Sequence, residues 1–290
     1  MSERAPRPPW PEFRAALDSV GYRPSRRLGQ CFLLDENAAR AIARDAAVGE
    51  GDVVLEVGPG CGFLSVHLAH AGARLHAVEI DPRLAAIAER FLAPYPGARV
   101  AVGDALAGKH RLGPAFLEGL PPPGVPWRLV ANLPYSISAP LLALVAALEP
   151  PPAAAVVLVQ EEVAQRLAAR PATPDWGPLS VAVQACFAVE LGRRLGPDLF
   201  WPRPRVESRL VHLDPRPDRS DALGRERVVA LARRLLLHRR KTLGRVLGDL
   251  LGDRGGAETI LTAGGWSAAQ RAEELGIDEW TRLERRVAER

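Results

Sequence analysis

The sequence has few cysteines, a single methionine and no long apolar run. Its three cysteines, Cys31, Cys61 and Cys186, are widely spaced and form no C-x-x-C pair, which argues against a disulfide framework and against a zinc site. No apolar stretch reaches the length of about 18 residues that a membrane span needs, and the arginine- and proline-rich start lacks the apolar core of a signal peptide. We therefore expect a cytoplasmic protein with no membrane span and no bound metal.

Lysine is also scarce, and the basic residues are unevenly distributed. Residues 1–214 contain 22 basic and 22 acidic residues, whereas residues 215–290 contain 16 and 12, so the net charge of +4 comes entirely from the last part. Such clustering favours a nucleic-acid partner, although a solvated helix face in an arginine-rich protein is the simpler alternative. The candidate phosphate-binding residues are Arg233, Arg234, Arg239, Arg240 and Lys241.

The length and composition predict two domains. With 290 residues, of which 47% are hydrophobic and 25% charged, the chain is an ordinary globular protein. Residues 1–22 are polar and proline-rich, and we expect them to form a flexible arm. We place a large α/β domain at 23–214 and a small all-helical domain at 215–290, because the apolar residues of the second segment recur with helical spacing after a proline-rich linker.

A glycine-rich turn follows the first predicted strand. The apolar stretch 53–57, interrupted once by an acidic residue, leads into Gly58-Pro59-Gly60-Cys61-Gly62 and then into a predicted helix over 63–70. Glycines at these positions let the backbone approach a ligand closely before the helix begins. Phe63 stands where the dinucleotide-binding pattern requires a third glycine, which argues against a nicotinamide cofactor.

Acidic residues follow the next two predicted strands. The strand over 74–78 ends at Glu79, where a carboxylate is placed to accept hydrogen bonds from ribose hydroxyls. The strand over 99–102 is followed by Asp104, which suits the amino group of an adenine. Either acidic residue alone could simply cap a helix, but together with the glycine turn they indicate a nucleoside pocket.

The tetrapeptide Asn132-Leu133-Pro134-Tyr135 ends a further predicted strand over 127–131. The asparagine provides a carbonyl acceptor for an exocyclic amino group, the proline rigidifies the backbone, and the tyrosine offers a stacking face. An ordinary strand-to-helix turn is the alternative, since asparagine and proline favour turns. Strands over 155–159, 181–189 and 206–213 would complete a seven-stranded sheet, with the last two paired antiparallel.

These motifs resemble, in order, those of the KsgA-type ribosomal RNA adenine N6-dimethyltransferases. The glycine turn with Glu79 is similar to the S-adenosylmethionine site of Rossmann-like methyltransferases, and the tetrapeptide resembles the motif of amino-group methyltransferases. The resemblance extends from about Arg23 to Leu283. The matching stretches lie at 27–33, 55–60, 103–105, 132–135, 159–166, 177–181, 200–208, 238–243 and 271–275.

The resemblance implies a seven-stranded, Rossmann-like methyltransferase domain followed by an RNA-binding helical domain, and it implies roles for particular residues. One position departs from the family, because Cys31 stands where an asparagine is usual; a small buried residue is the alternative role there. Phe200 is implied to lie beside the target base, with a core phenylalanine as its alternative. The implied methyl-donor contacts are Gln30, Cys31, Leu33, Gly58, Gly60, Glu79, Asp104 and Asn132, and the implied catalytic residues are Asn132, Leu133, Pro134, Tyr135 and Phe200.

The implied activity is transfer of two methyl groups from S-adenosylmethionine to N6 of each of two adjacent adenosines near the 3′ end of small-subunit rRNA. The partner would be an immature 30S subunit, and the enzyme a monomer. Three alternatives stay open: a macrolide-resistance enzyme acting on large-subunit rRNA, a non-catalytic ribosome-assembly or transcription factor on the same fold, and a small-molecule methyltransferase.

Overall fold

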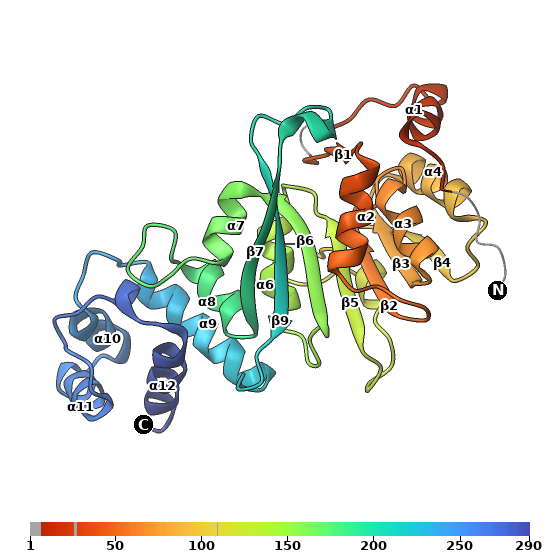
Figure 1. Cartoon of the computed structure of the whole chain (residues 1–290). Helices are drawn as coiled ribbons and strands as arrows, with labels where there is room; N and C mark the ends of the chain where they lie inside the picture. Colours follow the sequence, from red (N-terminus) through yellow and green to blue (C-terminus); the bar gives the residue numbers. More distant parts are fainter. Residues whose placement is uncertain (1–6, 26–27, 109) are drawn as a thin grey trace. The chain divides into compact units, whose positions relative to one another are not determined.

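The computed structural model describes residues 7–25, 28–108 and 110–290. The first six residues of the predicted arm and Arg27, the first residue of the motif at 27–33, lie outside it. The chain divides into two compact units (Figure 1). The first comprises Met1–Leu144, Pro152–Ala164 and Glu190–Asp214. The second comprises Val145–Pro151, Gln165–Val189 and Pro215–Arg290, and so includes two segments besides the predicted 215–290.

Within the described residues seven strands form one sheet in the order β4-β3-β2-β5-β6-β9-β7. The neighbours from β4 to β6 are parallel, and β9 joins β6 antiparallel. The predicted seven-stranded sheet is thus confirmed. The strands are β2 (Val53–Val57), β3 (Arg74–Glu79), β4 (Ala98–Val102), β5 (Trp127–Asn132), β6 (Ala154–Gln160), β7 (Phe187–Leu195) and β9 (Ser208–Pro215).

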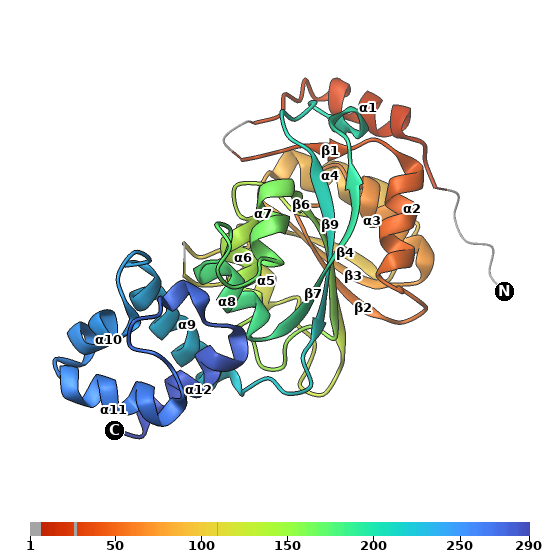
Figure 2. The same cartoon turned by 60° about the vertical axis from the view of Figure 1, so that its left-hand side comes forward.

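The central parallel strands β2, β3, β5 and β6 are mostly buried because helices cover this part of the sheet. Val54 and Leu55 of β2 are fully buried, and in both views α2, α3 and α4 lie together on one side of β2, β3 and β4 (Figures 1 and 2). Since β2, β3, β4 and β5 run parallel, their carboxyl ends meet at one edge. The helices from the start of the chain to residue 199 are α1 (Trp10–Ser19), α2 (Glu36–Asp45), α3 (Phe63–Ala71), α4 (Pro82–Leu92), α5 (Pro114–Leu117), α6 (Ser138–Val145), α7 (Glu161–Leu167), α8 (Pro178–Gln184) and η1 (Pro197–Leu199).

The prediction of a flexible arm over 1–22 is wrong for the part that the structure describes as α1. Its apolar residues recur with helical spacing, and Phe13 and Leu17 are fully buried in the core of the first unit. Phe13 stacks on Phe91 of α4 with ring centroids 3.9 Å apart. Proline enrichment is a poor sign of disorder here, because Pro9 and Pro11 occupy the cap and first turn of the helix, where proline is tolerated.

A strand predicted over 181–189 is also wrong in its first half. Residues 178–184 form α8, which begins at Pro178 after Gly177, and β7 starts only at Phe187. The Ser180 hydroxyl accepts a hydrogen bond from the Gly177 N–H at 3.1 Å, which closes the first turn. The proline and this local cap favour a helix here.

The second unit is helical, as predicted for 215–290. Its core is apolar and includes Trp176 and Trp280, both fully buried. Arg225 is 2% exposed and donates to the carbonyl oxygens of Ala146, Leu148 and Ser220, so its buried charge is well hydrogen-bonded. No helix among the described residues is long and apolar enough to cross a membrane. The elements of this part are α9 (Ala222–Leu236), α10 (Leu243–Leu251), α11 (Arg254–Gly264), η2 (Ala272–Glu274) and α12 (Ile277–Ala288).

Candidate active site

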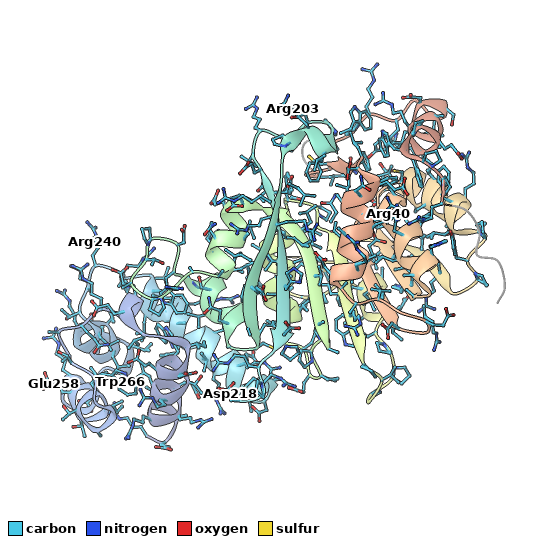
Figure 3. All side chains as sticks on the ribbon, viewed as in Figure 1. Arg40, Arg203, Asp218, Arg240, Glu258 and Trp266 are labelled. Atoms are coloured by element: carbon cyan, nitrogen blue, oxygen red, sulfur yellow. The ribbon has the colours of Figure 1, made fainter. Side chains whose placement is uncertain are left out.

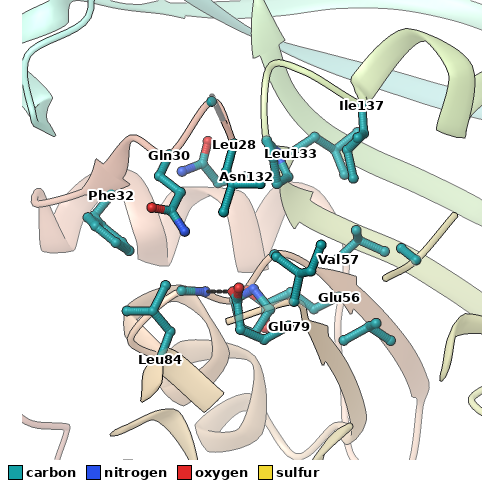
Figure 4. A pocket seen from close by; sticks show the side chains of 18 of the residues that line it. Leu28, Gln30, Phe32, Glu56, Val57, Glu79, Leu84, Asn132, Leu133 and Ile137 are labelled. Atoms are coloured by element: carbon teal, nitrogen blue, oxygen red, sulfur yellow. Dashed lines mark hydrogen bonds between the residues drawn. The ribbon is translucent and has the colours of Figure 1, made fainter. Parts of the chain in front are cut away.

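A cavity in the first unit lies at the carboxyl ends of β2, β3, β4 and β5 (Figure 4). Residues far apart in sequence converge there because parallel strands end at the same edge of the sheet. All the residues that the resemblance assigns to methyl-donor binding line the cavity. The whole tetrapeptide 132–135 lines it as well. The donor residues are Gln30, Cys31, Leu33, Gly58, Gly60, Glu79, Asp104 and Asn132.

The glycine turn forms the floor of the cavity. Gly58 and Gly60 have φ angles of 72° and 58°, in the left-handed region that disfavours other residues. A Cβ atom at Gly58 would lie 2.6 Å from the Pro134 ring, and one at Gly60 would lie 2.6 Å from the Phe32 ring. Any side chain at these positions would therefore push into the walls of the cavity, which explains the need for glycine in this turn.

Glu79 is held at the end of β3 by backbone donors. Its Oε2 accepts from the Gly60 N–H at 2.9 Å, and its Oε1 accepts from the Asp81 N–H at 3.0 Å. Only 4% of Glu79 is exposed, and burial raises the pKa of its carboxyl group, while the two N–H donors oppose that rise. Each carboxylate oxygen can accept more than one hydrogen bond, so Glu79 remains able to accept from two hydroxyl groups of a ligand.

Glu56 is a second buried carboxyl group, and the sequence motifs assign it no role. It is 1% exposed, lines the cavity from β2, and its Oε2 has no hydrogen-bond partner among the described residues. Burial, and to a smaller extent the nearby Glu79 carboxylate, raise the pKa of Glu56 to about 8. The sequence does contain a signal for Glu56, because it is the one acidic residue within an otherwise apolar strand. Charged residues rarely occupy such a buried position without a function.

Replacing Glu56 with glutamine is expected to flatten the dependence of stability on pH. The folded protein keeps Glu56 protonated, whereas the unfolded side chain ionises near its ordinary pKa of about 4.3. Because the folded pKa is raised to about 8, this contribution to stability is complete below the ordinary pKa and is lost as the pH rises toward 8. Denaturant unfolding of both proteins at pH 5 and pH 8.5 measures the effect.

The control for this comparison is Glu89→Gln, which changes an exposed glutamate of α4. Between the two pH values the wild-type protein and the Glu89→Gln variant should lose more stability than Glu56→Gln does. Equal losses in all three proteins would show that Glu56 ionises in the folded protein as an exposed carboxyl does.

Asn132, the last residue of β5, has a fixed side-chain amide. Its Nδ2 donates to the Cys31 carbonyl oxygen at 2.9 Å. The Leu133 N–H donates to Leu158 O at 3.0 Å, and this bond anchors the start of the tetrapeptide to β6. No described residue donates to Asn132 Oδ1 or to the Leu133 carbonyl oxygen. Two acceptors at the edge of the cavity are thus left for a ligand that carries an amino group.

Tyr135 is half-buried and lines the cavity beside these acceptors. Its hydroxyl group lies 2.7 Å from Ser208 Oγ on β9, within hydrogen-bond distance. Burial raises the pKa of Tyr135 to about 12, so the ring stays neutral at physiological pH. A neutral aromatic ring anchored by its hydroxyl group suits the stacking role predicted for this residue.

Cys31 contributes its backbone to the site. Its carbonyl oxygen orients the Asn132 amide, a contact that does not depend on the side chain at this position. Burial raises the pKa of the Cys31 thiol, so it is not a thiolate at neutral pH. The replacement of the usual asparagine by cysteine is therefore compatible with the orientation of Asn132.

The comparison with protein families agrees with this geometry. A family model described as ribosomal RNA adenine dimethylase matches residues 22–289, which include the cavity and most of the helical unit. The chain belongs to the ribosomal RNA adenine dimethylase family. The predicted activity, dimethylation of rRNA adenine by a methyltransferase, is confirmed at the level of this family.

Curated relatives in the dimethylase family are similar over most of their length. A Kineococcus radiotolerans protein named ribosomal RNA small subunit methyltransferase A is 38% identical over 276 residues, covering 94% of this chain and 89% of the relative. A Rubrobacter xylanophilus protein of the same name is 40% identical over 267 residues, covering 92% of this chain and 96% of the relative.

Solved structures confirm the predicted fold class. A dimethyladenosine transferase from Plasmodium falciparum superposes with a TM-score of 0.72, covering 87% of this chain and 95% of that one, at 22% identity. The 23S rRNA methyltransferase ErmE superposes with a TM-score of 0.63, covering 89% and 99% of the two chains, at 27% identity. The dimethylase fold, a seven-stranded methyltransferase domain followed by helices, is common to all three.

The structure does not support the role predicted for Phe200. This residue is 3% exposed, belongs to the core of the first unit and is not among the residues that line the cavity. Phe200 and Trp201 form the short strand β8, which pairs antiparallel with β1 (Phe32–Leu33), so that Phe200 lies opposite Leu33. In the structure Phe200 is therefore a core residue, and its place beside the target base stays a prediction.

The five basic residues predicted to bind phosphate fall into two groups. Arg239 is tied to its own unit, because it donates to Glu273 Oε2 at 2.8 Å and to the carbonyl oxygens of Pro174 and Thr173. Its guanidinium is therefore engaged within the unit rather than presented to phosphate. The other four form an exposed group at the end of α9 and in the following turn, where Arg240 extends away from the ribbon (Figure 3): Arg233, Arg234, Arg240 and Lys241. We call these four the exposed basic group.

Proposed function

We propose that this chain uses S-adenosylmethionine to dimethylate N6 of two adjacent adenosines near the 3′ end of small-subunit (16S) rRNA during ribosome biogenesis. The observation that carries the proposal is the Asn132 amide, whose oriented oxygen borders the cavity beside the glycine turn and Glu79. Identities of 38% and 40% to proteins named ribosomal RNA small subunit methyltransferase A support the choice of rRNA. We expect a cytoplasmic monomer that acts on an immature 30S subunit.

The groups that line the cavity suit S-adenosylmethionine. Glu79 has acceptor capacity for the ribose hydroxyls, and Asp104 bonds the Leu106 N–H through Oδ1 at 2.8 Å, which leaves Oδ2 for the adenine amino group. The unpaired, buried Oε2 of Glu56 suits a positively charged group, since a nearby cation would favour ionisation of this carboxyl. When bound, the donor supplies an electrophilic methyl group on a sulfonium. Leu33, which is 3% exposed, adds an apolar wall.

The tetrapeptide performs the chemistry by orienting the amino group of the target adenine. Adenine N6 is a poor nucleophile because its lone pair is delocalised into the ring. Asn132 Oδ1 and the Leu133 carbonyl oxygen would each accept one N6–H bond, which favours a pyramidal nitrogen with its lone pair aimed at the methyl carbon. Tyr135 would stack on the extruded base. As the N–C bond forms, the bond between the methyl carbon and the sulfonium sulfur would break, which leaves a neutral thioether. The nitrogen becomes positively charged in this step, and it then loses a proton to water.

Replacing Glu79 with alanine is expected to raise the dissociation constant for S-adenosylmethionine roughly tenfold to a hundredfold, the effect of losing charge-assisted hydrogen bonds. The variant also leaves the Gly60 and Asp81 N–H groups without their acceptor, so a loss of thermal stability should accompany it. Calorimetric titration of the donor measures the affinity. Glu79→Gln is the control. Because it retains one side-chain oxygen, its dissociation constant for the donor should lie between those of the wild type and Glu79→Ala. An unchanged affinity in Glu79→Ala would place the ribose contact elsewhere.

A methyl-transfer assay with product mapping tests the function itself. Labelled S-adenosylmethionine is incubated with small subunits that lack the modification, with large subunits and with free adenosine. We expect label in dimethyladenosine at two adjacent positions near the 3′ end of the small-subunit rRNA. The similarity to ErmE makes large-subunit rRNA the alternative substrate, and label there would replace our proposal. Label in neither rRNA would favour a non-catalytic role.

A further inference from the structure

The side-chain oxygen of Gln30 is fully engaged at the rim of the cavity. Gln30 Oε1 accepts from the Tyr22 hydroxyl at 2.6 Å and from the Ser25 N–H at 2.8 Å. These two bonds occupy both lone pairs of the oxygen, so they fix which end of the amide faces the cavity. Figure 4 shows the Gln30 nitrogen turned toward the space above Glu79. Only a ligand that offers a hydrogen-bond acceptor can use the group that remains, Nε2.

Tyr22 is itself held firmly. It is 4% exposed, its N–H donates to Leu17 O at the end of α1 at 2.9 Å, and its ring packs edge-on against Phe32 with centroids 6.0 Å apart. Burial raises the pKa of Tyr22 further above its ordinary value, so its hydroxyl remains a hydrogen-bond donor at any pH at which the enzyme works. Tyr22 therefore connects the packing of α1 to the orientation of Gln30.

A second contact of the Tyr22 ring connects it with Glu79. The Arg83 guanidinium lies 5.0 Å from the ring centroid and donates two hydrogen bonds to the Asp81 carboxylate. The Asp81 N–H in turn donates to Glu79 Oε1. Tyr22 thus contacts Gln30 directly through its hydroxyl group and is linked to Glu79 only indirectly, through Arg83 and Asp81.

We propose that Tyr22 is a positioning residue for the methyl-donor pocket: its hydroxyl holds Gln30 so that Nε2 donates to an acceptor of the bound S-adenosylmethionine. This inference rests on the proposed function, because it takes the donor as the ligand of the cavity. Without the hydroxyl, Gln30 Oε1 keeps only the Ser25 N–H, and the amide gains freedom to rotate its nitrogen away from the cavity. Donor binding must then order the side chain, which weakens affinity.

The test is Tyr22→Phe, which removes one oxygen atom and keeps the buried ring. Calorimetric titration with S-adenosylmethionine, without RNA, should show a dissociation constant about fivefold to tenfold higher, the usual effect of one net hydrogen bond. In a Gln30→Ala background the same substitution should change the dissociation constant by less than about twofold, because the residue through which Tyr22 acts is gone. In assays of methyl transfer the KM for the donor should rise, while the KM for the RNA substrate stays constant.

Tyr95→Phe serves as the matched control, since Tyr95 lies outside the cavity and should leave donor affinity unchanged. Equal donor affinity in Tyr22→Phe and wild type, with methyl transfer intact, would overturn the positioning role alone. An equal weakening with and without Gln30 would show that Tyr22 acts through the general packing of α1. A wild-type protein that binds no S-adenosylmethionine would overturn this inference and the proposed cofactor together.

Discussion

Asn132→Ala is expected to reduce methyl transfer by about 100-fold to 1000-fold, the range found when one oriented donor or acceptor is removed from a reacting centre. The structure makes the reason specific: Asn132 Nδ2 is already bonded to Cys31 O, so the amide presents its oxygen to the substrate. This interaction matters mainly in the reacting geometry, so RNA binding and the fold should change little. Single-turnover rates on unmodified small subunits provide the measurement.

Cys31→Ala is the matched control for Asn132→Ala. It removes the thiol but keeps the backbone carbonyl that orients Asn132, and we expect it to retain most of the activity. If Asn132→Ala still transferred methyl groups at more than a few per cent of the wild-type rate, the acceptor for adenine N6 would have to be another group. The Leu133 carbonyl oxygen would then be the remaining candidate in the tetrapeptide.

Removing the exposed basic group, as Arg233→Ala, Arg234→Ala, Arg240→Ala and Lys241→Ala together, is expected to weaken binding to the small subunit by at least an order of magnitude at low salt. Affinity falls as salt rises, and each lost phosphate contact reduces the magnitude of the slope of log affinity against log salt by about 0.7 to 0.9. The magnitude of the slope should therefore decrease by roughly three. Filter binding at several salt concentrations measures both quantities. Donor affinity should not change, because the cavity that we propose for the donor is lined by residues of the first unit.

Arg239→Ala separates RNA binding from folding. Its ion pair with Glu273 and its bonds to two carbonyl oxygens predict a lower melting temperature with an unchanged salt slope. If the fourfold variant also kept the wild-type slope, the exposed basic group would not contact phosphate. The rRNA would then have to be held by other residues of the chain.

The sequence predicted best the elements whose local pattern is compatible with only one kind of structure. Apolar stretches that are followed by turn residues predict parallel strands, and the strands at 53–57, 74–79, 98–102 and 127–132 lie within a residue or two of their predicted bounds. The motifs that follow these strands then predicted where the cavity lies, because the carboxyl ends of adjacent parallel strands lie at the same edge of the sheet. Family, fold class and the residues that line the cavity therefore all follow from the amino-acid sequence by itself.

Where a local pattern is compatible with two structures or roles, only the tertiary structure shows which one is present. The segment of α1 is a helix because Phe13 and Leu17 pack in the core of the first unit. An aromatic residue at position 200 could pack in a core or contact a base, and in the structure it is buried in the core. Arg239 and Arg240 are neighbours of identical chemistry, yet only the fold brings Glu273 to the first and leaves the second exposed. Likewise, only the fold leaves Glu56 Oε2 unpaired and turns the Tyr22 hydroxyl toward Gln30, because burial and partner choice depend on how the chain packs in three dimensions.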